Sequence, residues 1–262
     1  MQRANVVIVG EGKSIELIQN SKYLNKLYLT SNLKIKGGLN IKFNTFRELA
    51  QKCKALQADI VIVEDEKWIQ QGIADVLKQN FINCIASNAK WSELSIHNLY
   101  TRNLLEKYDI NTPQKLVLPI DFPVIVRADG IIKKANSVQE IIDIRKKIFE
   151  QSPVIGKTIF LEKFIDGEKY VVPSLFDGKS LLTFPNVNIE QELLNTYTKN
   201  LENLLRSEKA EFIGFINSKL ILSDNKLYNT GFSFEFLKPD FDVDFLYILN
   251  SAIYQKLDEI NL

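Results

Sequence analysis

The sequence predicts an α/β protein with a doubly wound parallel sheet at its N-terminal end, followed by an α+β region. The first observation is that short apolar segments alternate with amphipathic ones through about residue 90, as in parallel strands joined by helices. The second is Ala58–Val63, whose nearly continuous apolar character indicates a strand buried on both faces. The third is a change of pattern after Pro113, where strand-like segments predominate.

The N-terminal part begins with the apolar segment Asn5–Val9, which is ended by Gly10 and Gly12 and followed by an amphipathic segment at Ser14–Ile18. This order predicts a strand, a turn and a helix. The same reasoning predicts strands at Leu27–Leu29, Ile41–Phe43 and Ile82–Ala86, and helices at Phe46–Leu56, Ile69–Leu77 and Leu94–Tyr108.

The C-terminal part combines several strand-like segments with one charged helix. The strands are predicted at Pro123–Arg127, Thr158–Glu162, Tyr170–Leu175 and Lys219–Leu222, and the helix at Val138–Phe149. Mixed strands with few helices indicate an α+β unit. We therefore expect two domains, residues 1–98 and residues 99–262.

The charge balance and the lack of long apolar runs argue against several classes of protein. Thirty-three basic and 32 acidic residues leave a net charge of +1, so no overall field favours nucleic acid or an anionic membrane. No apolar run approaches a membrane span and no signal-peptide pattern is present, which predicts a cytoplasmic protein. Only Cys53 and Cys84 are present, and we expect both to be packing residues.

Two segments are specific enough to indicate a family. Pro123–Gly130 reads PVIVRADG and Phe160–Glu168 reads FLEKFIDGE. In this order they resemble the P-x-V-x-K-A-D-G segment and the E-E-F-L-D-G-E hinge of phosphoribosylamine–glycine ligase, the ATP-grasp enzyme that joins glycine to phosphoribosylamine in purine biosynthesis. The resemblance implies a Rossmann-like pre-ATP-grasp domain at residues 1–98 and a shortened ATP-grasp domain at 99–262, with the family's C-terminal domain absent.

The resemblance also implies an ATP cleft. Arg127 stands where the family has a phosphate-binding lysine, and Glu168 where it has a carboxylate that contacts the ribose. The alternative is that Arg127 forms a structural ion pair and Glu168 is an exposed turn residue. The candidate cofactor-binding residues are Arg127, Lys133, Lys134, Glu162, Lys163, Phe164 and Glu168.

Two glycine-rich loops of the family have no counterpart here. After Gly130 the sequence continues IIKKANSV, and the next glycine is Gly156. Since only glycine lets backbone N–H groups come close to phosphate, a backbone cradle is not expected in this stretch. Pro185–Asn186 is the only remnant expected of the second loop.

The metal and substrate positions also differ from those of the family. One alignment places Asn229 at a metal-binding glutamate, and another retains only Glu235, so Mg²⁺ binding is expected to be impaired. On the substrate side, Gly10 and Gly12 remain from a G-N-G-G-R-E-H turn and Glu66 from a G-P-E-A-P loop. The alternative is that the glycines of this turn allow the following helix to pack closely and bind no ligand.

Three functions remain open at this point. The first is ATP-dependent carbon–nitrogen ligation of the phosphoribosylamine–glycine ligase type, with weak or lost activity because stabilisers of the reacting phosphates are missing. The second is a non-catalytic protein that binds a nucleotide or small metabolite, and the missing glycines and carboxylates favour it. The third is a structural protein that serves a protein partner.

Overall fold

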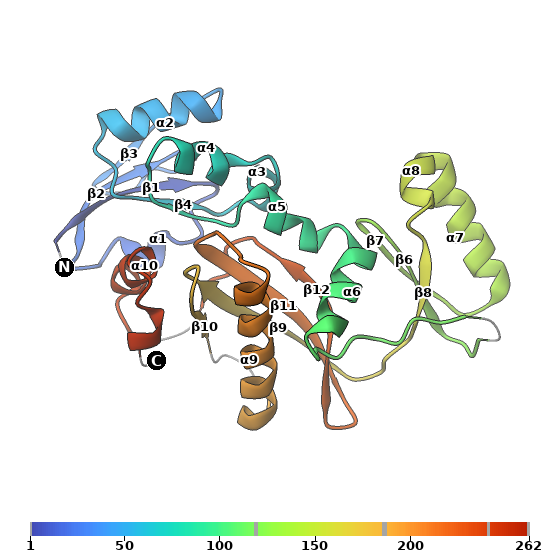
Figure 1. The fold of residues 1–262 in the computed structure, drawn as a ribbon. Coiled ribbons are helices and arrows are strands. Elements are labelled where there is room, and N and C mark those ends of the chain that lie inside the picture. Colours follow the sequence, from blue (N-terminus) through green and yellow to red (C-terminus); the bar gives the residue numbers. More distant parts are fainter. Residues whose placement is uncertain (1, 118–119, 185–187, 240–241, 261–262) are drawn as a thin grey trace.

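The computed structural model describes residues 2–117, 120–184, 188–239 and 242–260, and it contains three β-sheets (Figure 1). The first is parallel, with strand order β3-β2-β1-β4-β5. The second is antiparallel, in the order β10-β9-β11-β12, and the third is antiparallel, in the order β7-β6-β8. The predicted fold class, a parallel α/β sheet followed by an α+β region, is confirmed.

The parallel sheet follows from its apolar strands. Alternate residues of β1 serve opposite faces: Val7 and Val9 belong to one hydrophobic cluster, and Val6 and Ile8 to another. Helices α2, α3 and α4 cover the first face, and α1 and α10 the second (Figure 1). The elements are β1 (Ala4–Val9), α1 (Ile15–Ile18), β2 (Leu24–Leu29), β3 (Gly38–Asn40), α2 (Phe46–Ala55), β4 (Ile60–Val63), α3 (Glu66–Gln70), α4 (Ile73–Gln79), β5 (Cys84–Ile85) and α5 (Ala89–Ser92).

Three predicted elements of this half need correction. The third strand lies at Gly38–Asn40, before the predicted Ile41–Phe43. The helix predicted at Ile69–Leu77 is divided at Gly72, whose φ of 82° is left-handed and ends a helical path. The long helix predicted before Pro113 is likewise divided, into a 3-10 turn η1 (Glu93–Ser95) and α6 (Asn98–Lys107).

The four-stranded sheet carries the longest strands of the described chain. It contains β9 (Glu168–Phe176), β10 (Leu181–Thr183), β11 (Gly214–Ser223) and β12 (Lys226–Ser233). Helix α9 (Gln191–Ser207), which the sequence analysis did not predict, packs against it through residues such as Tyr197, Leu201 and Leu205. Both hydrophobic clusters of the parallel sheet continue into this second sheet, so the two sheets share their cores.

The three-stranded sheet forms a separate lobe with its own small core (Figure 1). It consists of β6 (Val124–Ala128), β7 (Ile131–Ala135) and β8 (Phe160–Lys163), covered by α7 (Val138–Gln151) and α8 (Pro153–Gly156). Its core is Val124, Val126, Ala135 and Ile141. Ser137 begins α7 by accepting a hydrogen bond from the N–H of Glu140, which is ordinary N-capping.

The C-terminal segment returns to the first sheet. Helix α10 (Phe245–Ile253) buries its apolar residues in the cluster that contains Val6 and Ile8, and the 3-10 turn η2 (Leu257–Glu259) follows it. Asp244 caps α10 by accepting from the N–H groups of Leu246 and Tyr247. Residues far beyond position 98 thus complete the core of the N-terminal sheet, and the boundary at that position stays a prediction.

Two observations concern the class of protein. In the described ranges, no helix is both long and apolar enough to cross a membrane. Cys53 and Cys84 are free thiols, with Cys53 buried under the parallel sheet. Burial raises the pKa of Cys53 to about 11, as expected for a packing residue rather than a reactive one.

Candidate functional site

A cavity of about 350 Å³ lies between the three-stranded and four-stranded sheets, and we call it the cleft. Its first wall comprises Ile125, Arg127, Ile132, Glu162, Lys163, Phe164 and Ile165. Its second wall comprises Lys169, Tyr170, Val171, Lys219, Leu220, Ile221 and Thr230, and Pro113 completes the lining. The cleft therefore combines apolar side chains with several cations.

Strand pairing explains why cations and apolar side chains share the second wall. In the antiparallel pair β9 and β11, Lys169 lies opposite Ile221 and Val171 lies opposite Lys219. Residues two apart on a strand share a face, so these four residues form one patch toward the cleft. Within that patch the two lysines are diagonal neighbours.

The segment after β8 offers unpaired backbone groups at the cleft. The N–H and C=O groups of Phe164 and Ile165 make no hydrogen bond within the described part of the chain. Gly167 fixes the path of this segment, because a Cβ at that position would lie 2.2 Å from the carbonyl oxygen of Leu222 on β11. A flat ligand with a donor and an acceptor on one edge would find partners for both here.

Arg127 lines the cleft, but its guanidinium is held in a buried ion pair. Its Nε donates to one carboxylate oxygen of Glu162, while Nε of Arg102 on α6 donates to the other. The three side chains are almost entirely buried. Burial, and next the charge of Arg102, lower the pKa of Arg127 to about 10. Arg127 thus forms the ion pair that was given as the alternative and also lines the cleft, so its role in cofactor binding stays a prediction.

The remaining cofactor candidates lie at different places. Lys163 and Phe164 line the cleft, and Nζ of Lys134 lies 4.2 Å from the centre of the Phe164 ring. Lys133 pairs with Val126, whose side chain belongs to the core beneath α7, so it lies on the face away from the cleft. Glu168 is exposed at the start of β9, outside the lining, and accepts a hydrogen bond from the Tyr170 hydroxyl.

The position of the first glycine-rich loop is a tight hairpin. β6 ends at Ala128 and β7 begins at Ile131, so only Asp129 and Gly130 connect them. Gly130 has a φ of 69°, and its N–H donates to the carbonyl of Ile96, which ties the turn to the start of α6. No loop extends from this hairpin over the cleft, in agreement with the missing glycines.

The predicted metal residues do not meet in the cleft. Asn229 is fully buried; its side-chain Nδ2 donates to the Tyr197 hydroxyl at 2.7 Å and its side-chain Oδ1 accepts from the N–H of Gly231. Glu235 lies in another cavity, 3.2 Å from Lys13. Across the residues that the structure describes, no three His, Cys, Asp or Glu side chains gather as a metal site. The cleft offers lysine amines, the hydroxyls of Tyr170 and Thr230, and a single carboxylate, Glu162, which two arginines already hold; this donor set does not fit Mg²⁺. Pro185–Asn186, the expected loop remnant, lies outside the described residues.

The predicted substrate residues surround a cavity of about 250 Å³ at the end of β1 and β4. Its lining is largely acidic: Glu11, Lys13, Glu64, Asp65, Glu66 and Glu235. The turn that contains Gly10 and Gly12 borders it, while Glu66 accepts a hydrogen bond from the N–H of Phe234 at 3.1 Å. The arrangement brings the predicted substrate residues and Glu235 together.

Glu64 fills the glycine turn from within the chain. Its carboxylate accepts hydrogen bonds from the N–H groups of Gly12, Lys13 and Ser14 at 2.7, 2.9 and 2.7 Å. The side chain is 1% exposed. Gly10 permits this approach, because a Cβ there would lie 2.8 Å from Cβ of Glu64. The donors of the turn are thus already satisfied by an internal anion.

Sequence reasoning missed two of these residues. Arg102 lies in the predicted helix, but its role depends on the position of Glu162, which is 60 residues away. Glu64 stands where the family's G-P-E-A-P loop begins with glycine, and this replacement was a usable signal. A carboxylate directly after a fully buried strand requires donors, and the nearest candidates were in the turn after the neighbouring strand.

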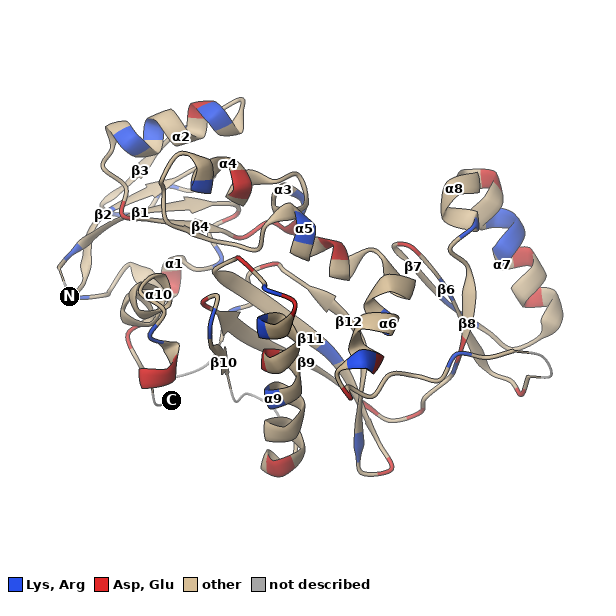
Figure 2. Cartoon of the chain, in the orientation of Figure 1, with Lys and Arg blue, Asp and Glu red and all other residues tan. Residues whose placement is uncertain are grey.

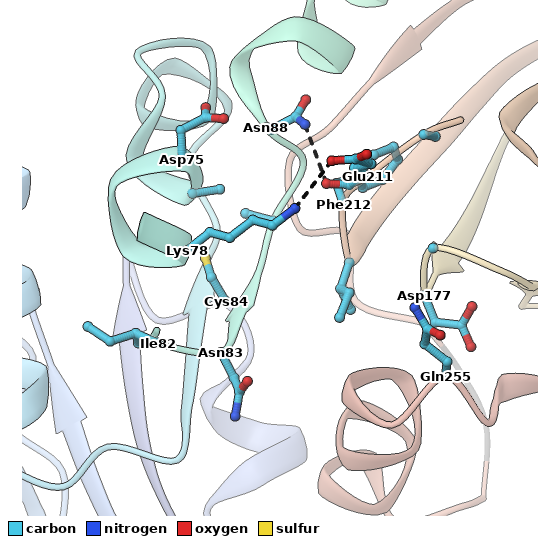
Figure 3. Close-up of a pocket in the computed structure, with 15 residues that line it drawn as sticks. Asp75, Lys78, Ile82, Asn83, Cys84, Asn88, Asp177, Glu211, Phe212 and Gln255 are labelled. Carbon is cyan, nitrogen blue, oxygen red and sulfur yellow. Dashed lines mark hydrogen bonds and ion pairs between the residues drawn. The ribbon is translucent and has the colours of Figure 1, made fainter. Parts of the chain in front are cut away.

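A further cavity of about 380 Å³ lies between α4, β5 and the residues that precede β11 (Figure 3). Lys78 lies 3.6 Å from Glu211 at its edge, and the amide of Asn88 donates to the backbone carbonyl of Glu211. Asp75, Asn83 and Asp177 in its lining are hydrogen-bonded to backbone groups outside the cavity, and we place no candidate site there.

Comparison with known sequences supports the resemblance drawn from the motifs. No family model matches the chain. A phosphoribosylamine–glycine ligase from Fusobacterium nucleatum is 24% identical, over 98% of this chain and 75% of that protein. The alignment spans 323 positions, more than the 262 residues of this chain, so that ligase has segments inside the aligned region that this chain lacks.

Solved structures show the same fold. The structure of phosphoribosylamine–glycine ligase from Thermotoga maritima matches with a TM-score of 0.68 at 14% identity, over 88% of this chain and 69% of that one. The structure of D-alanine–D-alanine ligase from Bacillus anthracis with ATP matches with a TM-score of 0.60 at 17% identity, over 100% of both chains. The three-sheet arrangement is therefore that of ATP-grasp ligases.

Proposed function

We propose that this chain, a relative of the phosphoribosylamine–glycine ligases with the fold of ATP-grasp ligases, binds a nucleotide in the cleft. We propose further that it does not catalyse ligation. The proposal depends on the segment after β8, from Phe164 to Gly167, which we call the hinge. Phe164 and Ile165 combine apolar side chains with unpaired backbone donors and acceptors at one wall of a cavity of about 350 Å³. A purine base has the flat shape and the polar edge that such a wall accommodates.

The proposed absence of ligation depends on three features. The hairpin at Asp129–Gly130 provides no backbone donors above the cleft. The cleft has no carboxylate free to hold a metal, since Glu162 is shared by two arginines. Glu64 occupies the donors of the substrate-side turn. Loss of one charge stabiliser typically slows such a reaction by a factor on the order of 100 or more, and here several are lost together.

The test is a thermal-shift titration with ATP, ADP and GTP. A ligand that binds only the folded state raises the melting temperature by mass action, so we expect at least one nucleotide to do so. Val171→Trp should abolish the response, because Val171 lines the cleft and is 45% exposed there. Val154→Trp is the matched control, since Val154 is exposed on α8 and outside the cleft.

Three results would overturn the proposal. One is a wild-type melting curve that no nucleotide changes, and the fold is then better explained as an interaction surface for a protein partner. The second is a nucleotide response that Val171→Trp leaves intact, which would mean that the nucleotide binds outside the cleft. The third is release of ADP that depends on both glycine and phosphoribosylamine at rates typical of ligases. That result would make the chain an active enzyme.

A further inference from the structure

The cations of the cleft are placed without ionic partners. Lys163, Lys169 and Lys219 all line it, and none of them forms an ion pair within the described ranges. They come from both walls, with Lys163 on β8 and the other two on β9 and β11 (Figure 2). The surroundings of the cleft therefore attract anions from two sides.

The acidic groups near these lysines do not neutralise them. Glu162 is the one carboxylate among the lining residues, and it is buried between Arg102 and Arg127, so this triad itself carries a net positive charge. The Glu168 carboxylate accepts a hydrogen bond from the Tyr170 hydroxyl. Lining side chains thus leave a positive charge that only a ligand or solvent ions can balance.

The spacing of two of the lysines is unfavourable without an anion. Lys169 and Lys219 are diagonal neighbours on one face of the sheet, a relationship in which backbones are roughly 7–8 Å apart. Like charges at this spacing repel each other, and a polyanion that lies between them removes the repulsion. Phosphate groups extending from a base at the hinge would come between the two walls.

We infer that the cleft binds the phosphates of a nucleotide through lysines and without a divalent metal. The inference rests on the proposed function and specifies how that site recognises its ligand. Where metal-dependent sites supply carboxylates, the sheet beneath this cleft supplies the amines of Lys169 and Lys219; the Thr230 hydroxyl beside them donates to the backbone carbonyl of Lys219. Mg²⁺ bound to the nucleotide in solution cancels much of the charge that the lysines recognise, so it should weaken binding.

The experiment is calorimetric titration of the full chain with ADP, once in EDTA and once in excess Mg²⁺. We expect tighter binding in EDTA. Lys219→Glu and Lys169→Glu should each weaken ADP binding in EDTA by about tenfold or more and reduce its salt dependence. Lys199→Glu is the matched control, because Lys199 is on α9, outside the cleft and without an ion pair in the described structure.

Adenosine and inorganic pyrophosphate separate the two parts of the ligand. Adenosine should bind equally well with and without Mg²⁺, and pyrophosphate binding should depend on the two lysines. Binding of ADP that requires Mg²⁺, or that both lysine variants leave unchanged, overturns the inference while the proposed function stands. Absence of ADP, ATP and adenosine binding under both conditions overturns the proposed function and the inference together.

Discussion

The carboxylate of Glu64 accepts both the backbone N–H and the side-chain hydroxyl of Ser14, each at 2.7 Å. Without Glu64, the glycine turn after β1 would present several converging N–H groups without an acceptor, which is the usual geometry of an anion-binding site. Here the anion belongs to the chain itself and comes from the end of the adjacent strand β4. The turn is therefore part of the folded core and does not wait for a ligand.

Glu64→Ala should destabilise the protein by about 3 kcal/mol or more, because the buried N–H of Ser14 and the part-buried N–H groups of Gly12 and Lys13 lose their acceptor. Urea unfolding followed by circular dichroism measures the change. Glu11→Ala is the matched control, since Glu11 is an exposed carboxylate at the same cavity. We expect the control to change stability by less than about 0.5 kcal/mol. Equal effects of the two substitutions would contradict the structural role of Glu64.

Glu162→Gln should be strongly destabilising, on the order of 3–5 kcal/mol, because it removes the charge that two buried arginines share. Replacing Arg102, Glu162 and Arg127 together by methionine should recover much of this loss, since no unpaired charge then remains buried. Glu106→Gln provides a surface comparison. Nζ of its partner Lys115 lies 3.4 Å from the Glu106 carboxylate, and the two side chains are 33% and 49% exposed, so the expected cost is at most about 1 kcal/mol.

The measurement is again chemical unfolding, made on all three variants at one pH. A triple variant less stable than Glu162→Gln would show that the triad contributes to stability as a unit. A Glu162→Gln protein as stable as the wild type would show that the arginines are hydrated in solution.

Much of the fold was predictable because it depends on local patterns. β4, for example, is buried along its whole length and was evident from its continuous apolar residues. Helix α9 was not predicted, although its apolar positions Leu194, Tyr197 and Leu201 have helical spacing. Strand β7 was not predicted either, although the lack of a glycine-rich loop after Gly130 was.

The site was less predictable, because its chemistry depends on contacts between distant parts of the sequence. Arg127 lies on the strand beside the hinge, yet its charge is bound by Glu162 and shared with Arg102. Lys169 and Lys219 were not selected, since they lie on different strands and meet only through the register of the sheet. Sequence motifs identify the wall of a cleft, whereas ion pairs and strand register in the folded chain determine which charges remain free.

Stability should depend on Cys53 at alkaline pH. Burial raises the pKa of this thiol from 9.0 to about 11, so the unfolded chain loses the proton at a lower pH than the folded protein. The resulting contribution to stability is fully present below pH 9 and is lost as the pH rises from about 9 to about 11. Two pKa units correspond to about 3 kcal/mol.

The measurement compares wild-type protein with Cys53→Ala in urea at a series of pH values, because lysines and tyrosines also titrate in this range. The difference between the two proteins should shrink as the pH rises from about 9 to about 11. A constant difference would show that the thiol of Cys53 ionises equally in the folded and unfolded states.

Gly167→Ala should disrupt the hinge. A Cβ at this position would lie 2.2 Å from the carbonyl oxygen of Leu222, so the hinge or β11 must move. We expect a loss of about 2–3 kcal/mol in stability, together with a reduced nucleotide response, because the backbone groups of Phe164 and Ile165 move with the hinge. Gly37→Ala is the control, because Gly37 has a φ of 80° but a Cβ added there would meet nothing within 4 Å. We expect this substitution to lower the free energy of unfolding by only about 1 kcal/mol. The nucleotide response should persist. Thermal melting with and without ADP measures both effects at once. If Gly167→Ala melts like Gly37→Ala and still responds to ADP, the path of the hinge over β11 is not what positions the cleft.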